Sequence, residues 1–236
     1  MGLINQLRTN MPSWSNHIIQ CWEDDFESYN GFSHGMLKLE VNSIDVTTIV
    51  GQRDHYCGET WYDAINGKHI NHNDKMLRNI SHHDNNPLYY FDANTKDDWS
   101  LLTFDNKSWY SDEGNHRTII AKFAFHVNQQ RGLLHSGLLQ GIKLFKASID
   151  MEAHRLFNEC KDLIREEGLN VHIDGPIKDR YTQWEPRIRW YDERYPRKHR
   201  RRGGFFNMDE FKEFASEFLR DDGRIRLRDK LLSFFT

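Results

Sequence analysis

The fold is decided by one stretch of the chain, Ser111-Asp112-Glu113-Gly114-Asn115-His116-Arg117-Thr118. This stretch stands between a strand-like run, Trp99 to Tyr110, and a helix-like run, Thr118 to Val127. A glycine turn that leads from a strand into a helix directs backbone N–H groups at one spot, and the helix dipole adds partial positive charge there. The stretch therefore predicts a site for phosphate or another anion at the start of a helix.

The side chains of the turn suit the same ligand. Gly114 allows the backbone to approach phosphate, and Asn115 and Thr118 supply hydrogen bonds to phosphate oxygens. Arg117 is suited to bidentate contact with phosphate. His116 is a candidate donor to phosphate or a general acid/base. These residue types predict a nucleotide site with His116 and Arg117 as the catalytic candidates.

Two acidic residues precede the glycine. Asp112 and Glu113 are candidate ligands for Mg²⁺, which binds through one or two carboxylates together with phosphate oxygens, and they are the remaining catalytic candidates. The alternative is an acidic turn that balances the charge of Arg117. Both interpretations are compatible with the sequence.

The order of motifs resembles the signature of the ParB/sulfiredoxin superfamily. A strand and an acidic turn lead to Gly-Asn-His-Arg-Thr, residues 114–118, and a helix follows that begins Ile-Ile-Ala-Lys-Phe-Ala. The flanking elements are similar to those of the family, and in chain order they are Leu37–Val41, Asn42–Asp45, Gln52-Arg53 and Lys143–Ile149. The resemblance covers roughly residues 36 to 150. It implies an α/β (α+β) fold, with a mixed-sheet core and additional C-terminal helices, and it implies that Arg53 completes the nucleotide site.

The turn departs from two branches of this superfamily. Sulfiredoxins have a cysteine at the position of Asn115, so thiol-based repair of peroxiredoxin is not expected. The usual ParB turn is Gly-Glu-Arg-Arg, so cytidine-nucleotide switching is not expected either. The His-Arg form is closer to the enzyme-like branches, which include small-molecule kinases, nucleotide hydrolases and the ParB-like nucleases of plasmids and phages.

The chain is expected to divide into an N-terminal extension (1–35), the superfamily-like core (36–150) and a helical C-terminal region (151–236). In the first part, Trp14 to Phe26 predicts a short helix. In the core, the segment Asn66 to Asn86 is rich in Asn, Asp and His and predicts turns and loops, and Leu88 to Phe91 predicts a strand. Residues 99–110 predict a hairpin.

Two helices are predicted in the C-terminal region. Asp150 is a candidate N-cap for the first, which carries apolar residues at helical spacing and stops at Gly168. Asn207 is the candidate N-cap of the second, Met208 to Arg220. The terminal Leu231 to Phe235 either closes the core or pairs two subunits, so a homodimer is possible.

A basic and aromatic stretch, Lys178 to Gly204, lies between these helices. Cations interleaved with aromatic rings are suited to backbone contact and base stacking, so the stretch is a candidate DNA-binding segment. The alternative is a solvated basic loop or one that contacts an acidic partner. The candidate nucleic-acid contacts are Arg187, Arg189, Trp190, Arg197, Lys198, Arg200, Arg201 and Arg202.

Four histidines, His69, His72, His82 and His83, have a spacing that permits zinc binding, but no cysteine is well placed beside them. A polar surface loop that covers the nucleotide site is the favoured interpretation.

Composition sets the remaining bounds. Hydrophobic residues make up 38% of the 236 residues, which is enough for a packed core. The net charge of −3 means that any binding to nucleic acid depends on local charge. Cys21, Cys57 and Cys160 form no CxxC motif, and no membrane span or signal peptide is expected, so the sequence predicts a cytoplasmic protein.

These observations lead to one expected function and two alternatives. The expected function is binding of a nucleoside triphosphate, most simply ATP, with Mg²⁺, for hydrolysis of the nucleotide or cleavage of DNA. The first alternative is a small-molecule kinase with the same fold. The second is a non-enzymatic DNA-binding or inhibitor protein of a mobile element.

Overall fold

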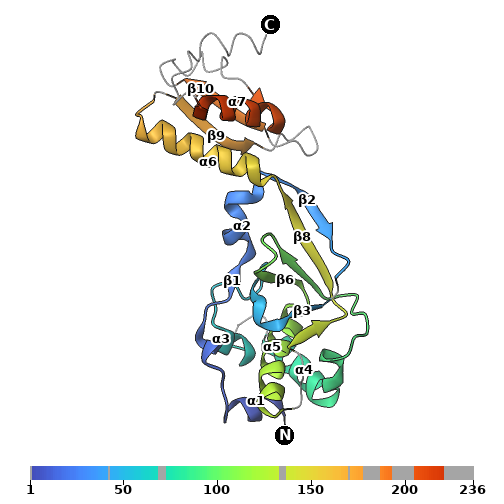
Figure 1. The fold of residues 1–236 in the computed structure, drawn as a ribbon. Coiled ribbons are helices and arrows are strands. Elements are labelled where there is room, and N and C mark those ends of the chain that lie inside the picture. Colours follow the sequence, from blue (N-terminus) through green and yellow to red (C-terminus); the bar gives the residue numbers. More distant parts are fainter. Residues whose placement is uncertain are drawn as a thin grey trace. The chain divides into compact units, whose positions relative to one another are not determined.

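The computed structural model describes residues 2–41, 43–68, 73–132, 137–169, 171–177, 187–192 and 205–220, and its architecture is mixed α/β as expected (Figure 1). The chain forms two compact units. Unit 1 comprises residues 1–27 and 36–147, and unit 2 comprises residues 28–35 and 148–236. The N-terminal residues belong to unit 1, because Leu3, Leu7 and Ile19 are buried in its core.

A six-stranded mixed sheet has the strand order β1-β4-β6-β5-β8-β2. Its strands are β1 (Gln20–Cys21), β2 (Ser33–Lys38), β4 (Ile49–Gln52), β5 (Ser100–Thr103), β6 (Trp109–Glu113) and β8 (Lys143–Ile149). β4 is parallel to β1 and to β6, whereas β5 is antiparallel to β6 and parallel to β8. The predicted hairpin of residues 99–110 is confirmed, and the family-like element Lys143–Ile149 forms the strand β8. β3 (Ser43–Asp45) and β7 (Leu138–Gln140) pair separately.

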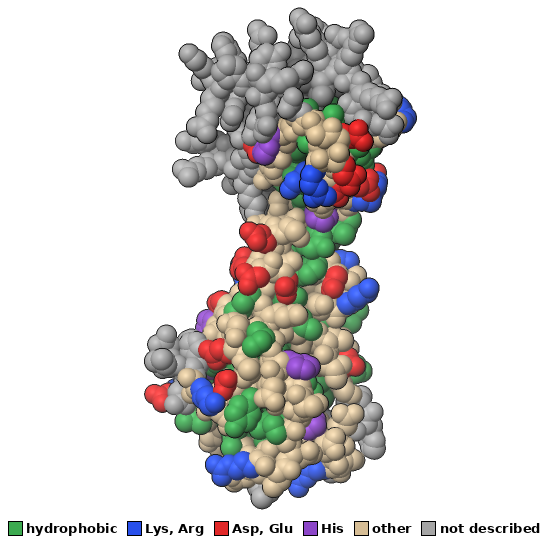
Figure 2. All heavy atoms as spheres, turned by 90° about the vertical axis from the view of Figure 1, so that its left-hand side faces the viewer, with side chains coloured by type: hydrophobic (Ala, Val, Ile, Leu, Met, Phe, Trp, Pro, Cys, Tyr) green, Lys and Arg blue, Asp and Glu red, His purple; other side chains and the backbone are tan. Residues whose placement is uncertain are grey.

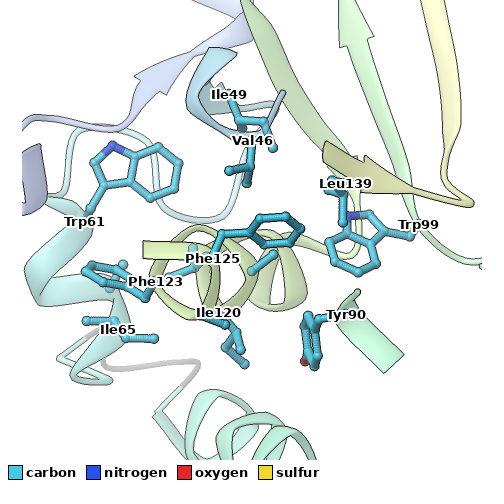
Figure 3. Packing of buried hydrophobic residues seen from close by; sticks show 14 of the residues in the cluster. Val46, Ile49, Trp61, Ile65, Tyr90, Trp99, Ile120, Phe123, Phe125 and Leu139 are labelled. Carbon is cyan, nitrogen blue, oxygen red and sulfur yellow. The ribbon is translucent and has the colours of Figure 1, made fainter. Parts of the chain in front are cut away.

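The central helix of unit 1 is α5 (Asn115–Gln130), which begins directly after the glycine of the turn. α5 contacts three further helices, α1 (Leu3–Leu7), α3 (Trp61–Ile65) and α4 (Asn73–Asn85). Figure 3 shows buried side chains on several sides of α5, including Trp61, Phe123 and Trp99. Apolar contact around most of the helix explains why Ile119, Ile120 and their neighbours form a continuous apolar run.

Unit 2 has its own core. α6 (Met151–Glu166) and α7 (Met208–Arg220) pack together, and β9 (Val171–Ile177), β10 (Arg187–Asp192) and β11 (Phe205–Phe206) form an antiparallel sheet. Both predicted helices are confirmed. The apolar stripes bury Leu156, Phe157 and Cys160 on α6 and Phe211, Phe214, Ala215 and Phe218 on α7.

Two predictions for residues 66–91 are wrong. The segment expected to be loop contains the helix α4, because Met76, Ile80 and His83 recur at helical spacing and are all buried. Many Asn, Asp and His residues occupy its other faces, and this polar composition concealed the stripe. The strand expected at Leu88–Phe91 is instead the 3₁₀ helix η3 (Pro87–Tyr90), which begins with proline at a position that needs no N–H donor.

The helix predicted for Trp14–Phe26 is also wrong. This segment divides into the 3₁₀ helix η1 (Ser13–Asn16), the short strand β1 and the start of α2 (Trp22–Asn30). The β1 backbone pairs with β4, which takes residues 20 and 21 out of helical conformation. A further 3₁₀ helix, η2 (Val46–Thr48), precedes β4.

On the face shown in Figure 2, acidic and basic side chains of the described residues are interspersed with polar and apolar ones. In the part of the chain that the structure describes, no helix has the length and apolarity needed to cross a membrane.

Candidate functional site

The candidate site lies where two parallel strands end and α5 begins. β4 and β6 run in the same direction, so their carboxyl ends, Gln52 and Glu113, meet at one edge of the sheet. In open α/β sheets, ligands bind outside this edge. The Arg53 N–H donates to the Ser111 carbonyl (2.8 Å), which holds the two strand ends together.

Gly114 makes the connection between β6 and α5. Its φ of +77° is left-handed, and a Cβ atom at this position would lie 2.9 Å from the Trp99 ring. Glycine meets both requirements because it has no Cβ atom. As the N-cap of α5, Gly114 provides no side-chain acceptor for the first-turn N–H groups, which have no intrahelical partners in any α-helix.

A pocket of about 870 Å³ opens at this helix start. Its walls come from the turn, from α4 and η3, and from Asp98 just before β5. The lining residues are His55, Lys75, Asn79, His82, Asn85, Asn86, Tyr89, Tyr90, Asp98, Asp112, Glu113, Gly114, Asn115, His116 and Arg117. Six of the predicted site residues are thus brought together, namely Asp112, Glu113, Gly114, Asn115, His116 and Arg117.

Arg117 is held by the protein's own groups. Its Nη1 donates to the Tyr89 hydroxyl (2.8 Å) and to Asp98 Oδ1 (2.7 Å), its Nη2 donates to the Asp98 carbonyl, and the guanidinium lies 5.5 Å from the Trp99 ring centroid. Burial lowers the pKa of Arg117, but the contacts with Asp98 and Tyr89 together outweigh burial and raise that pKa above its ordinary value. The side chain of Arg117 is only 17% exposed, whereas that of Asp98 is 79% exposed. Asp98 is therefore free to turn toward water if an anion replaces it.

A second set of contacts fixes the first residue of α5. Asn115 Nδ2 donates to Asp54 Oδ1 (3.2 Å), and the buried Gln52 Nε2 donates to the Asn115 carbonyl (3.2 Å). Asn115 Oδ1 is buried and has no hydrogen-bond partner among the described residues. The ring of His116 packs edge-on against Tyr56 at 5.5 Å, and His55 binds the same Asp54 oxygen at 2.6 Å. These contacts hold the start of α5 against the end of β4 and the residues that follow it.

Asp112 and Glu113 belong to β6 and not to a turn. Asp112 accepts from Arg53 Nη1 (2.9 Å) and from Ser100 Oγ (3.3 Å), so its charge is balanced by Arg53. The Glu113 side chain is exposed beside the pocket. One available carboxylate fits Mg²⁺ only when phosphate oxygens complete its coordination, which is the usual manner for this ion. No group of three or more His, Cys, Asp or Glu residues suited to a metal occurs in the described ranges.

Two predicted contacts lie elsewhere. Arg53 pairs with Asp112 and Glu23 and does not line the pocket. Thr118 is fully buried, and its hydroxyl accepts from Trp99 Nε1 (2.9 Å) and bonds Ser111 Oγ (2.9 Å). The Thr118 hydroxyl therefore joins α5 to β6 and to Trp99, the residue before β5, and the expectation that it contacts phosphate is corrected.

Sequence reasoning missed the residues of α4. Lys75, Asn79 and His82 occur at i, i+4 and i+7, and all three line the pocket. This polar spacing was the available signal, and it lies beside the buried stripe of the same helix, one residue step or about 100° around the axis. Of the four histidines in the histidine-rich segment, His82 lines the pocket, whereas His83 is buried against Asp84.

Several predicted residues fall outside the structural description. His69, His72 and the basic run Arg197, Lys198, Arg200, Arg201 and Arg202 lie outside the described residues. Arg187, Arg189 and Trp190 belong to β10, where the backbone pairs with β9 and β11.

Comparison with protein-family models finds no match to this chain, and neither does comparison with curated proteins or with solved structures. The assignment of a function therefore depends on the pocket and on the residues that surround it.

Proposed function

We propose that unit 1 is a ParB/sulfiredoxin-like nucleotide-binding domain, which holds the phosphates of a nucleoside triphosphate at the start of α5 and performs phosphate-bond chemistry there. The observation that carries this proposal is the pocket of about 870 Å³ at an α-helix start whose N-cap is a left-handed glycine. Pockets for small molecules commonly measure about 300–1,000 Å³. A helix start supplies backbone N–H groups and positive dipole charge to phosphate.

Arg117 is the proposed phosphate clamp. A phosphate accepts the same bidentate hydrogen bonds as a carboxylate and carries more charge, so it competes with the exposed Asp98 for the guanidinium. The Tyr89 hydroxyl and the Trp99 ring keep the guanidinium in place during this exchange. Lys75 of α4 adds a second cation to the pocket.

His116 is the proposed acid/base group, and Glu113 is the proposed carboxylate ligand of Mg²⁺. His116 stands second in α5, beside the proposed phosphate position, and its ring is oriented by Tyr56 and His55. Mg²⁺ bound with the nucleotide would neutralise phosphate charge. DNA, as a further partner, would be bound by the basic stretch Arg197–Arg202.

A kinase is the second candidate function, because the same pocket is lined by Asn79, Asn85 and Asn86. Side-chain amides both donate and accept hydrogen bonds, which suits an acceptor with several hydroxyl groups. ATP would be the phosphate donor in this alternative, and ADP release would then depend on the added alcohol.

The proposal is tested by comparing wild type with His116→Ala. His34→Ala, which removes an exposed histidine away from the pocket lining, is the control. Phosphate release from ATP with Mg²⁺, nicking of plasmid DNA and alcohol-dependent ADP release are measured in parallel. In whichever of these assays wild type is active, we expect the rate of His116→Ala to be lower by about 10²–10⁴-fold, the usual contribution of a general acid or base. Unchanged activity in a folded His116→Ala protein would contradict the assignment.

A further inference from the structure

A second pocket of unit 1, of about 460 Å³, shares no lining residue with the first. Its walls come from η1, η2, β4, α3 and α5. In the view of Figure 3, Trp61, Val46 and Ile49 lie on one side of α5, and all three line this pocket. Lys122 and His126 of α5 also line it, and they stand at i and i+4 on one helix face.

Lys122 is a buried amine, since only 8% of the residue is exposed. Its Nζ donates to the Ile49 carbonyl (2.6 Å) and to the Val46 carbonyl (3.2 Å). A neutral amine has two N–H donors and one lone pair, so these two carbonyls satisfy both donors of the neutral form. No described carboxylate forms an ion pair with this amine. Burial lowers the pKa of Lys122 to about 8, although the charge of Asp45 opposes the shift.

Aromatic rings enclose the amine. Nζ lies 4.8 Å from the Trp61 ring centroid and 5.2 Å from that of Trp14, and Phe125 also lines the pocket. These rings suit the apolar part of a small ligand, although Gln20, Asp45 and Thr47 also line the pocket, and burial keeps most water from the amine. Exclusion of water is the condition under which lysine serves as a nucleophile toward carbonyl compounds.

His126 contacts the same indole as Lys122. Its ring stands edge-on to Trp14 with centroids 6.3 Å apart. Its Nε2 is buried and has no hydrogen-bond partner among the described residues. Burial lowers the pKa of His126, more than a hydrogen bond to the Asn10 backbone raises it, so the ring is neutral at pH 7. A neutral imidazole nitrogen of this kind can accept a proton.

We propose that this pocket binds a small apolar aldehyde and that Lys122 condenses with it to form an imine. The Nζ lone pair attacks the carbonyl carbon, the C=O π bond breaks, and the oxygen receives the proton that nitrogen loses. His126 Nε2 carries this proton from nitrogen to oxygen, then takes the remaining N–H proton of the carbinolamine and delivers it to the hydroxyl, which leaves as water while C=N forms. The balance is amine plus aldehyde to imine plus water, and no oxidant or reductant takes part.

The test uses the full chain with benzaldehyde as the probe and sodium cyanoborohydride to reduce any imine to a stable benzylamine. Peptide mass spectrometry then compares Lys122 with Lys107, an exposed lysine. Near pH 7.5, about a quarter of amines with a pKa near 8 are neutral, against about one in a thousand at an ordinary lysine pKa. We expect Lys122 to be benzylated at least about tenfold faster than Lys107, because part of this advantage is lost to slower entry into the pocket.

Two further readouts separate a reactive site from a structural lysine. The labelling rate of Lys122 should rise with a midpoint near pH 8, and the other titratable residues that line the pocket are Asp45, His17 and His126. His126→Gln should slow labelling of Lys122 by about tenfold and leave that of Lys107 unchanged. An unlabelled Lys122 in a protein whose Lys107 is labelled would overturn the proposal, and so would equal labelling of the two lysines.

Discussion

At the scale of single residues, burial and charge oppose each other at Lys122. A charged amine at this position has lost most of its water, and two backbone carbonyls and two indole rings replace that water only in part. The unfolded chain binds the proton with the ordinary pKa of 10.5, whereas the folded chain binds it with a pKa of about 8. Folding therefore becomes more favourable as pH rises from about 8 to 10.5.

Lys122→Met tests this linkage. The free energy of unfolding of wild type, relative to that of the variant, should increase by about 2 kcal/mol between about pH 7.5 and pH 9.5. Each pKa unit of the shift corresponds to about 1.4 kcal/mol. Urea unfolding at both pH values measures the difference, and the exposed Lys107→Met is the matched control. A wild-type-to-variant difference that is constant with pH would show that the Lys122 amine stays charged in the folded state.

The residues of the turn could be predicted from the local sequence, whereas their partners from distant segments could not. The glycine, histidine and arginine of the turn were predicted because they are adjacent in the chain and their chemistry is local. Asp98 and Tyr89, which hold Arg117, come from segments 19 and 28 residues away, and only folding brings them together. The Thr118 hydroxyl was misassigned because sequence does not show that Trp99 Nε1 reaches it.

At the scale of secondary structure, the predictions succeeded where capping and periodicity agreed. In unit 2, Asp150 Oδ1 accepts from the Ala153 N–H (2.9 Å), and Asn207 and Glu210 form reciprocal hydrogen bonds at the start of α7. Both helices also carry clean apolar stripes. α4 has a buried stripe, but its first turn carries no strong apolar signal and its polar residues favour turns, so local propensity pointed away from the helix.

Asp150 links two helices of unit 2, because its Oδ2 also accepts from Lys212 Nζ of α7 at 3.0 Å. Burial raises the pKa of Asp150, but the Ala153 N–H and Lys212 outweigh it and hold that pKa below 3.8. The stability that Asp150 contributes is thus present at neutral pH and is lost as pH falls through its folded pKa.

Asp150→Ala should lower the free energy of unfolding by about 1–2 kcal/mol, the usual cost of losing an N-cap. Asp150→Asn should cost less than about 1 kcal/mol, because asparagine caps equally well and only the partly exposed ion pair is lost. Chemical unfolding at pH 7 and at a pH below 3.8 measures both, with Glu152→Gln in the same first turn as control. Equal losses in the Ala and Asn variants would show that the ion pair and not the cap stabilises α6.

At the scale of the whole molecule, charge and topology limit what the protein can bind and where. The net charge of −3 gives no general attraction to polyanions, so phosphate binding has to come from a local site. The parallel pair of strands β4 and β6 offers a place for the proposed site by ending beside the start of α5. The proposed ligand site of unit 1 is therefore a consequence of strand order together with one glycine.

The central claim is that phosphate binds at the start of α5, and it is tested most directly by thermal unfolding with ATP, ADP, GTP and CTP, each with and without Mg²⁺. A ligand at 100 times its dissociation constant stabilises a protein by about 2.7 kcal/mol, which raises the melting temperature by several degrees. The variants are Arg117→Ala and Asp98→Asn, and Arg131→Ala at the other end of α5 is the control.

The account predicts that at least one nucleotide raises the melting temperature of wild type and Arg131→Ala, that Arg117→Ala loses this increase, and that Asp98→Asn enlarges it by releasing the guanidinium. No increase with any nucleotide in wild type and in Asp98→Asn, or an equal increase in Arg117→Ala, would contradict the account.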